Sequence, residues 1–150
     1  MKRFKWRLER VLDIKTKQEQ KERAELLELT ERLAEKRGEL LMRQKMLKDV
    51  IKDLARADPK HRLGAQEFFL RYAATSDEQI KRLKDQVGEL ESQQKEKIAE
   101  VHKIRRLKEG LEELRAEAKR RFIEEQEKLY QKQLDETAAV SFVRRAQSRG

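Results

Sequence analysis

Histidine, glycine and cysteine are the residue types that most often mark a reactive site, and their pattern in this chain argues against one. The two histidines, His61 and His102, lie far apart, and neither has an H-x-x-x-H partner that would place two imidazoles on one helix face. The five glycines form neither a G-x-G-x-x-G pattern nor a P-loop. Cysteine is absent, which excludes disulfides and thiolate ligands. We therefore predict no enzyme activity, no catalytic residue, no metal site and no cofactor.

Acidic residues are numerous, but a carboxylate acts as an acid or base only in a concave and largely dry pocket. The composition does not favour such a pocket, because charged residues make up 45% of the chain and hydrophobic residues only 37%. These side chains are too polar to fill a thick core, yet Glu, Lys, Arg, Leu, Ala and Gln all favour helix. The composition therefore predicts long helices that share a narrow apolar seam. Disorder is the alternative, and the periodicity decides between them.

Leucine recurs at intervals of seven in the first part of the chain, which is typical of a coiled coil. We predict a helix over residues 4–57 that ends at Asp58-Pro59, because proline cannot continue a helical ladder. A second heptad pattern predicts a helix over residues 77–139, which would begin at a capping box formed by Thr75 with Glu78 or by Ser76 with Gln79. Residues 58–76 would form a short helix or loop, and residues 140–150 a basic tail. The predicted core consists of Leu26, Leu33, Leu40, Leu47, Val50, Leu54, Leu83, Val87, Leu90, Val101, Ile104 and Leu111.

The two stripes predict an all-α fold, in which one long antiparallel two-helix coiled-coil hairpin makes a single, monomeric domain. One register aligns both leucine columns. It pairs Leu54 with Leu83, Leu47 with Leu90, Val50 with Val87, Leu33 with Ile104, Leu26 with Leu111, Leu8 with Leu129, Lys36 with Val101 and Arg43 with Gln94. Glu19, Lys15 and Glu22 interrupt the first stripe, and Gln94, Lys97 and Lys108 interrupt the second. In this register the basic ends of the chain lie together.

Some residues have two readings that the sequence leaves open. The aromatic residues Phe68, Phe69 and Tyr72 either pack the bend of the hairpin or form an exposed docking patch. Trp6 lies off the seam and is a candidate for burial in a partner. The net charge of +9 would suit a basic arm that binds nucleic acid, but acidic residues are interleaved throughout, which disfavours it. No stretch reaches the ~18 apolar residues of a membrane span.

The opening Phe4-x-Trp6-x-Leu8-x-x-Val11-Leu12-x-x-Lys15 resembles the start of the flagellar FliJ family. The closing segment 133–139, QLDETAA, followed by Arg144-Arg145, is similar to the tail of that family. The resemblance implies a non-catalytic stalk and general chaperone component of the bacterial flagellar type III export apparatus, which assists flagellum assembly. It would lie in the cytoplasm, peripherally associated with the inner membrane at the flagellar base. The nearest alternative is the equivalent stalk of a virulence type III secretion system.

The resemblance also implies partners. They are the hexameric flagellar export ATPase and its regulator, the membrane export-gate protein and export chaperones, with no small-molecule substrate. The tip that faces the export gate would carry Phe68, Phe69 and Tyr72. The end that faces the ATPase would carry Phe4, Trp6, Leu8, Leu12, Leu134, Asp135, Arg144 and Arg145.

Overall fold

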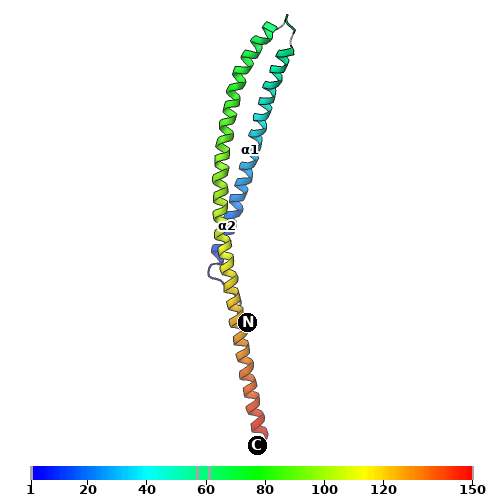
Figure 1. Cartoon of the computed structure of the whole chain (residues 1–150). Helices are drawn as coiled ribbons and strands as arrows, with labels where there is room; N and C mark the ends of the chain where they lie inside the picture. Colours follow the sequence, from blue (N-terminus) through cyan, green and yellow to red (C-terminus); the bar gives the residue numbers. More distant parts are fainter. Residues whose placement is uncertain (1, 57, 61, 150) are drawn as a thin grey trace. The chain divides into compact units, whose positions relative to one another are not determined.

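The chain folds into two long antiparallel α-helices joined by a short connection, as the computed structural model shows for residues 2–56, 58–60 and 62–149. Helix α1 spans Glu9–Arg56 and helix α2 spans Arg62–Arg149. The two helices lie side by side in opposite directions next to their connection (Figure 1). The described residues contain no β-strand. The predicted all-α helical hairpin is therefore confirmed. His61 and Ala57, which the sequence analysis considered, lie outside the described residues.

Helix α1 begins at Glu9, five residues later than the predicted start at Phe4. The segment before it carries Lys2, Arg3, Lys5 and Arg7, and positive charge is unfavourable at a helix N-terminus because the macrodipole is positive there. Glu9 is the first acidic residue and occupies the first turn. The carbonyl of Leu8 accepts a hydrogen bond from the Leu12 amide at 3.0 Å, so Leu8 directly precedes the helix. At its other end, α1 stops at Arg56, shortly before Pro59.

Helix α2 begins at Arg62 and not near residue 77, and it continues to Arg149 instead of ending near residue 139. The predicted start at Thr75-Ser76 lies inside the helix. A capping box stabilises a helix start by about 1 kcal/mol. Burial of several further side chains against α1 outweighs this amount, so the helix continues past the capping box. Phe69, Ser76 and Leu83 follow one another at heptad spacing, and each is half-buried or buried. The seam therefore extends two heptads further towards the connection than the sequence analysis placed it.

The helices cluster into two compact units, each with its own part of the seam. In the unit Glu19–Lys103, the buried apolar side chains are Leu33, Ile80, Leu83, Val87 and Val101. The half-buried predicted core residues there are Leu26, Leu40, Leu47, Val50, Leu54 and Leu90. In the unit Met1–Gln18 with Ile104–Gly150, Leu12 and Ile104 are buried and Leu111 is half-buried. Narrow burial of this kind is what a two-helix seam provides.

The predicted register is wrong by about two heptads, or roughly 14 residues. Arg43 was expected to face Gln94, but its guanidinium donates to Gln79 Oε1. Gln94 instead donates to the Thr30 hydroxyl at 3.1 Å, and Arg37 pairs with Glu91 at 2.9 Å. The reason is that α2 begins at Arg62, soon after α1 ends at Arg56, so that it returns beside α1 much sooner than it would after a tip spanning 58–76. A heptad stripe cannot by itself distinguish two registers that differ by whole heptads.

Candidate functional site

The N-terminal segment closes onto α2 through an aromatic contact. The rings of Phe4 and Phe122 lie 5.6 Å apart between centroids, tilted by 55°. The guanidinium of Arg115 lies over the Phe4 ring at 5.7 Å from its centroid, and its Nε donates to Glu9 at 2.7 Å. One arginine therefore binds both the aromatic segment and the first turn of α1. Such tilted ring pairs and cation–π contacts each contribute of order 1 kcal/mol.

Beyond this contact α2 continues as an arm with no covering element. Every described residue from 127 to 149 is exposed. Next to the Phe4–Phe122 contact the surface is hollowed into a groove of about 690 Å³, lined by Lys2, Phe122, Ile123, Gln126, Glu127, Leu129, Tyr130 and Gln133. Further along, large apolar side chains remain accessible at Leu134, Val140, Phe142 and Val143. The arm therefore presents exposed apolar side chains along the described residues 127–149.

The structure separates the residues predicted for the ATPase-facing end into two groups. Phe4, Trp6 and Leu8 are half-buried and Leu12 is buried, all at the beginning of α1 or in the segment before it. The remaining four are exposed on the arm of α2: Leu134, Asp135, Arg144 and Arg145. Asp135 accepts a hydrogen bond from Gln131 at 3.3 Å.

The two basic ends of the chain do not meet as the sequence analysis expected. Lys2 lies beside residues 122–133, whereas Arg144 lies about 16 Å further along the helix axis than Gln133. The predicted pairing of Leu8 with Leu129 also fails, because Phe4 already contacts Phe122 and Leu129 is 53% exposed. The cause is the same two-heptad error in register.

The three aromatic residues predicted for the tip lie on the first turns of α2. Phe68 is 65% exposed and its ring stacks on Tyr72, with centroids 6.1 Å apart. Phe69 is half-buried and faces α1. A shallow cavity of about 170 Å³ lies here, lined by Val50, Asp53, Leu54, Ala65, Phe68 and Phe69. The structure therefore divides the three residues: Phe69 packs at the helix–helix contact, whereas Phe68 is exposed, and docking of a partner at Phe68 stays a prediction.

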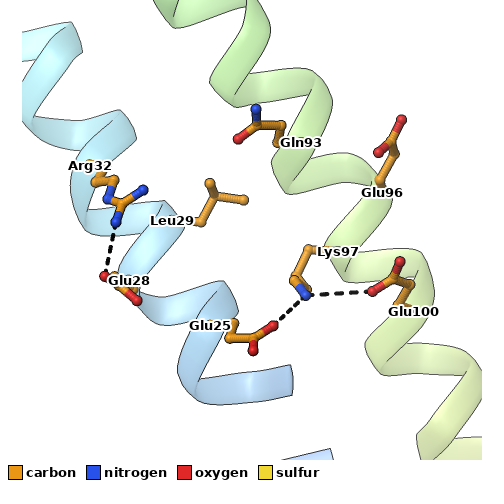
Figure 2. Close-up of a pocket in the computed structure, with 8 residues that line it drawn as sticks. All are labelled: Glu25, Glu28, Leu29, Arg32, Gln93, Glu96, Lys97 and Glu100. Atoms are coloured by element: carbon orange, nitrogen blue, oxygen red, sulfur yellow. Dashed lines mark hydrogen bonds and ion pairs between the residues drawn. The ribbon is translucent and has the colours of Figure 1, made fainter. Parts of the chain in front are cut away.

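A charged cluster interrupts the seam in the unit Glu19–Lys103. Lys97 lies on the heptad stripe of α2, and its Nζ is 2.7 Å from Glu22 and 2.6 Å from Glu25, both on α1. Glu100 on its own helix lies at 3.5 Å. Figure 2 shows Lys97 reaching from α2 towards Glu25 on α1 and Glu100 on its own helix. These three residues line part of a hollow of about 350 Å³. The lysine side chain is only 21% exposed, so these ion pairs are better shielded from water than ordinary surface pairs.

The pairing changes the proton affinity of both partners in this cluster. The hydrogen bond to Glu22, followed by that to Glu25, raises the pKa of Lys97 well above its ordinary value. The hydrogen bond from Lys97 lowers the pKa of Glu22 below its ordinary value of 4.5. Both shifts keep the pair charged across the neutral pH range. The cluster therefore stabilises the contact between the helices and has no group poised for acid–base catalysis.

Glu19 provides a second charged position on the seam. Its side chain is buried, although it occupies the stripe between Leu12 and Leu26. Arg23, one turn further along α1, pairs with it at 3.0 Å. The sequence identified both Glu19 and Lys97 as interruptions of the stripes, but it did not indicate their partners. Arg115 was missed entirely, because a single arginine among many carries no signal before its neighbours are known.

The described residues lack two further features. Among residues 2–56, 58–60 and 62–149, no group of three or more His, Cys, Asp and Glu side chains is placed to hold a metal ion. Within the same ranges, neither helix contains a stretch that is apolar over the length required to cross a bilayer.

Comparison with known proteins gives one match. A family model described as flagellar FliJ protein matches residues 4–147, which is nearly the whole chain. No curated protein and no solved structure matches the chain.

Proposed function

Because the chain belongs to the flagellar FliJ protein family, which gives it a role related to flagellar export, we propose that it is a non-catalytic stalk and general chaperone component of the export apparatus. The match over residues 4–147 is the observation that carries this proposal, because it spans both helices and the terminal segments together. In this proposal the rod couples the hexameric export ATPase, with its regulator, to the membrane export gate. It also binds export chaperones, and it associates with the cytoplasmic face of the inner membrane at the flagellar base.

The ATPase-facing end is proposed to be the terminal unit, and its arm supports this assignment. Its surface combines exposed apolar side chains with the basic pair Arg144 and Arg145. Apolar surface supplies affinity and fixed charge supplies orientation, which is the usual composition of a docking interface. The aromatic cluster around Phe4 would contribute by fixing the N-terminal segment beside the start of this arm.

The gate-facing end is proposed to be the connection and the first turns of α2. The exposed ring of Phe68, stacked on Tyr72 next to a shallow cavity, supports it. Aromatic side chains bury large areas at low entropic cost and often dominate the binding energy of an interface. Serine at positions 68, 69 and 72 would therefore abolish gate binding if this end is the docking site.

The decisive experiment compares two truncations with the whole chain. Deletion of residues 1–14 or of residues 139–150 is expected to reduce hexamer formation and stimulation of the export ATPase. Unchanged stimulation by both truncated proteins would contradict the ATPase-facing assignment. A pull-down from flagellated cells tests the wider proposal, since the export ATPase should be recovered with the full chain.

A virulence secretion stalk remains the competing function, because such proteins share the hairpin layout. Gene neighbours separate the two. Flagellar ATPase and rod genes beside this gene support the flagellar assignment, and needle and translocator genes would overturn it.

A further inference from the structure

The two seam stripes of this hairpin can pair in more than one way. A shift of one helix by two heptads keeps the same side chains on the seam, because each heptad returns the stripe to the same face. In the structure Arg43 lies at Gln79, and Thr30 at Gln94. In a register shifted by two heptads, Arg43 would lie at Gln94 instead. That shifted register is the one that leucine pairing alone predicts.

The shifted register would match leucine with leucine about as well as the observed one does, and it would remove a serine from the seam. It brings Leu47 to Leu90 and Leu54 to Leu83, and leucine pairs at such positions are the strongest part of a seam. In the observed register Leu54 shares a cavity with Phe69. Between that cavity and the Arg43–Gln79 contact, the same register brings Ser76 to the level of Leu47. Ser76 is buried to 3% exposure, although its small polar side chain offers little apolar area to the seam.

The sequence also carries the helix start that the shifted register requires. Thr75-Ser76-Asp77-Glu78 is a capping signal that α2 passes through without using. Inside the helix, the Thr75 hydroxyl donates to the Arg71 carbonyl at 3.1 Å, and Glu78 pairs with Arg82 at 2.8 Å. If residues 62–76 left the helix, the same side chains could cap a shorter α2. The capping signal at Thr75–Glu78, which lies inside α2 in the observed register, would therefore mark the start of α2 in the shifted register.

The Lys97 cluster opposes the shift. In the observed register Lys97 has two cross-helix carboxylates, at 2.6 and 2.7 Å. In the shifted register it would lie at the level of Leu40, on the apolar stripe, and would lose both. Only Glu100, on its own helix at 3.5 Å, would remain beside it. A charged side chain on the seam that loses its cross-helix partners is unfavourable, which is how single charged seam positions select register. The Arg37–Glu91 pair would be lost as well.

We propose that this hairpin has a second helix register, displaced by two heptads, and that the ion pairs of Lys97 with Glu22 and Glu25 hold it in the observed one. The displacement moves α1 about 21 Å along α2. It converts residues 62–76 into part of a longer connection, and it carries Leu8 towards Leu129 on the exposed arm. A partner that binds the carboxylates of Glu22 and Glu25 would remove the ion pairs that oppose the shift and so change which residues of the arm are covered. The inference stands on the two stripes and does not depend on the function proposed above.

Thiol cross-linking can report each register separately, because the chain has no native cysteine. Arg43→Cys with Gln79→Cys reports the observed register, and Arg43→Cys with Gln94→Cys reports the shifted one. Each pair is placed in the whole chain with Lys97→Leu, which suits an apolar stripe. Each is also combined with Glu22→Gln plus Glu25→Gln, which removes both cross-helix carboxylates from Lys97. Lys95→Leu, an exposed lysine on the same turn as Lys97, is the matched control. A short thiol-specific cross-linker is used at a protein concentration low enough to exclude links between copies.

With the native seam, the 43–79 pair is expected to cross-link and the 43–94 pair to remain near background. Lys97→Leu is expected to raise the ratio of 43–94 to 43–79 product about tenfold, because it removes both cross-helix ion pairs that favour the observed register. The helical circular dichroism should fall by the contribution of residues 62–76, and the Lys95→Leu control should match the native protein. The proposal is overturned if the 43–94 cross-link stays at background both in Lys97→Leu and in the Glu22→Gln plus Glu25→Gln variant. If Lys97→Leu loses its helical circular dichroism and so fails to fold, the 43–94 yield of the Glu22→Gln plus Glu25→Gln variant decides whether the shifted register exists.

Discussion

The Nζ atom of Lys97 on α2 lies 2.7 Å from Oε2 of Glu22 on α1, within the apolar seam of the hairpin. Glu25 binds the same ammonium group at 2.6 Å, so one lysine joins two turns of the opposite helix. This contact shows that the helix–helix seam contains ion pairs as well as leucine contacts. Two of the charged positions that weaken the stripes in sequence, Glu22 and Lys97, are paired across the helices in space, and their pairing identifies which turns face each other.

The Lys97–Glu22 pair predicts a defined pH dependence of stability. A raised lysine pKa gives a contribution that is complete below the ordinary value of 10.5 and is lost as pH rises through the folded pKa. A lowered glutamate pKa gives a contribution that is complete above 4.5 and is lost as pH falls through the folded pKa. The difference in melting temperature between the native chain and Glu22→Gln should therefore be constant between about pH 5 and pH 10 and should shrink outside that window. Glu89→Gln, a control at an exposed position, should show no pH-dependent difference of this kind from the native chain.

The Phe4–Phe122 contact predicts a measurable coupling between two distant parts of the sequence. Phe122→Ala is expected to lower the free energy of unfolding by about 1–2 kcal/mol, less than for a fully buried ring because Phe122 is only half-buried. A double-mutant cycle with Phe4→Ala should give a coupling of about 0.5–1.5 kcal/mol in urea unfolding. Phe142→Ala, on a ring that is 73% exposed, should change stability by less than about 0.5 kcal/mol. Strict additivity of the Phe4 and Phe122 variants would mean that the contact is absent in solution.

Substitutions of Phe68 and Phe69 should distinguish a contribution to partner binding from a contribution to stability. Phe68→Ser is expected to leave the free energy of unfolding within about 0.5 kcal/mol of the native value, because the ring is 65% exposed. It should nevertheless weaken binding to the export gate if that end docks there. Phe69→Ser is expected to lower stability by about 1–2 kcal/mol, because this side chain lines the cavity between the helices. Gate binding that is unaffected by Phe68→Ser would remove the tip from the proposed interface.

The basic pair on the arm should matter for the partner and not for the fold. Arg144→Glu with Arg145→Glu is expected to reduce stimulation of the export ATPase, with a melting temperature equal to that of the native chain, because both side chains are exposed. Arg105→Glu with Arg106→Glu makes the same charge change at exposed positions away from the arm and should leave stimulation unchanged. Equal loss in both variants would show that net charge, and not the arm, controls the effect.

Two helix glycines offer a test of close approach by a partner. A Cβ at Gly38 or Gly88 would meet no atom within 4 Å. Alanine at either position is therefore expected to raise the free energy of unfolding by about 0.5–1 kcal/mol, through helix propensity and lower entropy of the unfolded chain. If a partner packs against the backbone there, the stabilised variants will bind it more weakly. Unchanged binding would show that no partner packs closely against the backbone at these two positions.

The sequence alone determined the class of fold and the family. Heptad leucines and strong helix formers favour two long helices, and Asp58-Pro59 ends the first of them, because both effects act within a few residues of each other along the chain. The terminal motifs indicated the family, and the family match over residues 4–147 confirmed it. Interruptions at Glu19 and Lys97 were visible too, though without their partners.

Only the tertiary structure decided the register, the start of α2 and the arrangement of the chain ends. A heptad pattern repeats, so leucine columns align equally well at offsets of whole heptads, and the sequence-based alignment took the wrong one. The choice depends on the length of the connection at residues 57–61 and on charge pairs such as Lys97 with Glu22. Those pairs join residues far apart in sequence, where local propensity has no influence. The same shift brings Phe4 to Phe122 and leaves the arm of α2 uncovered.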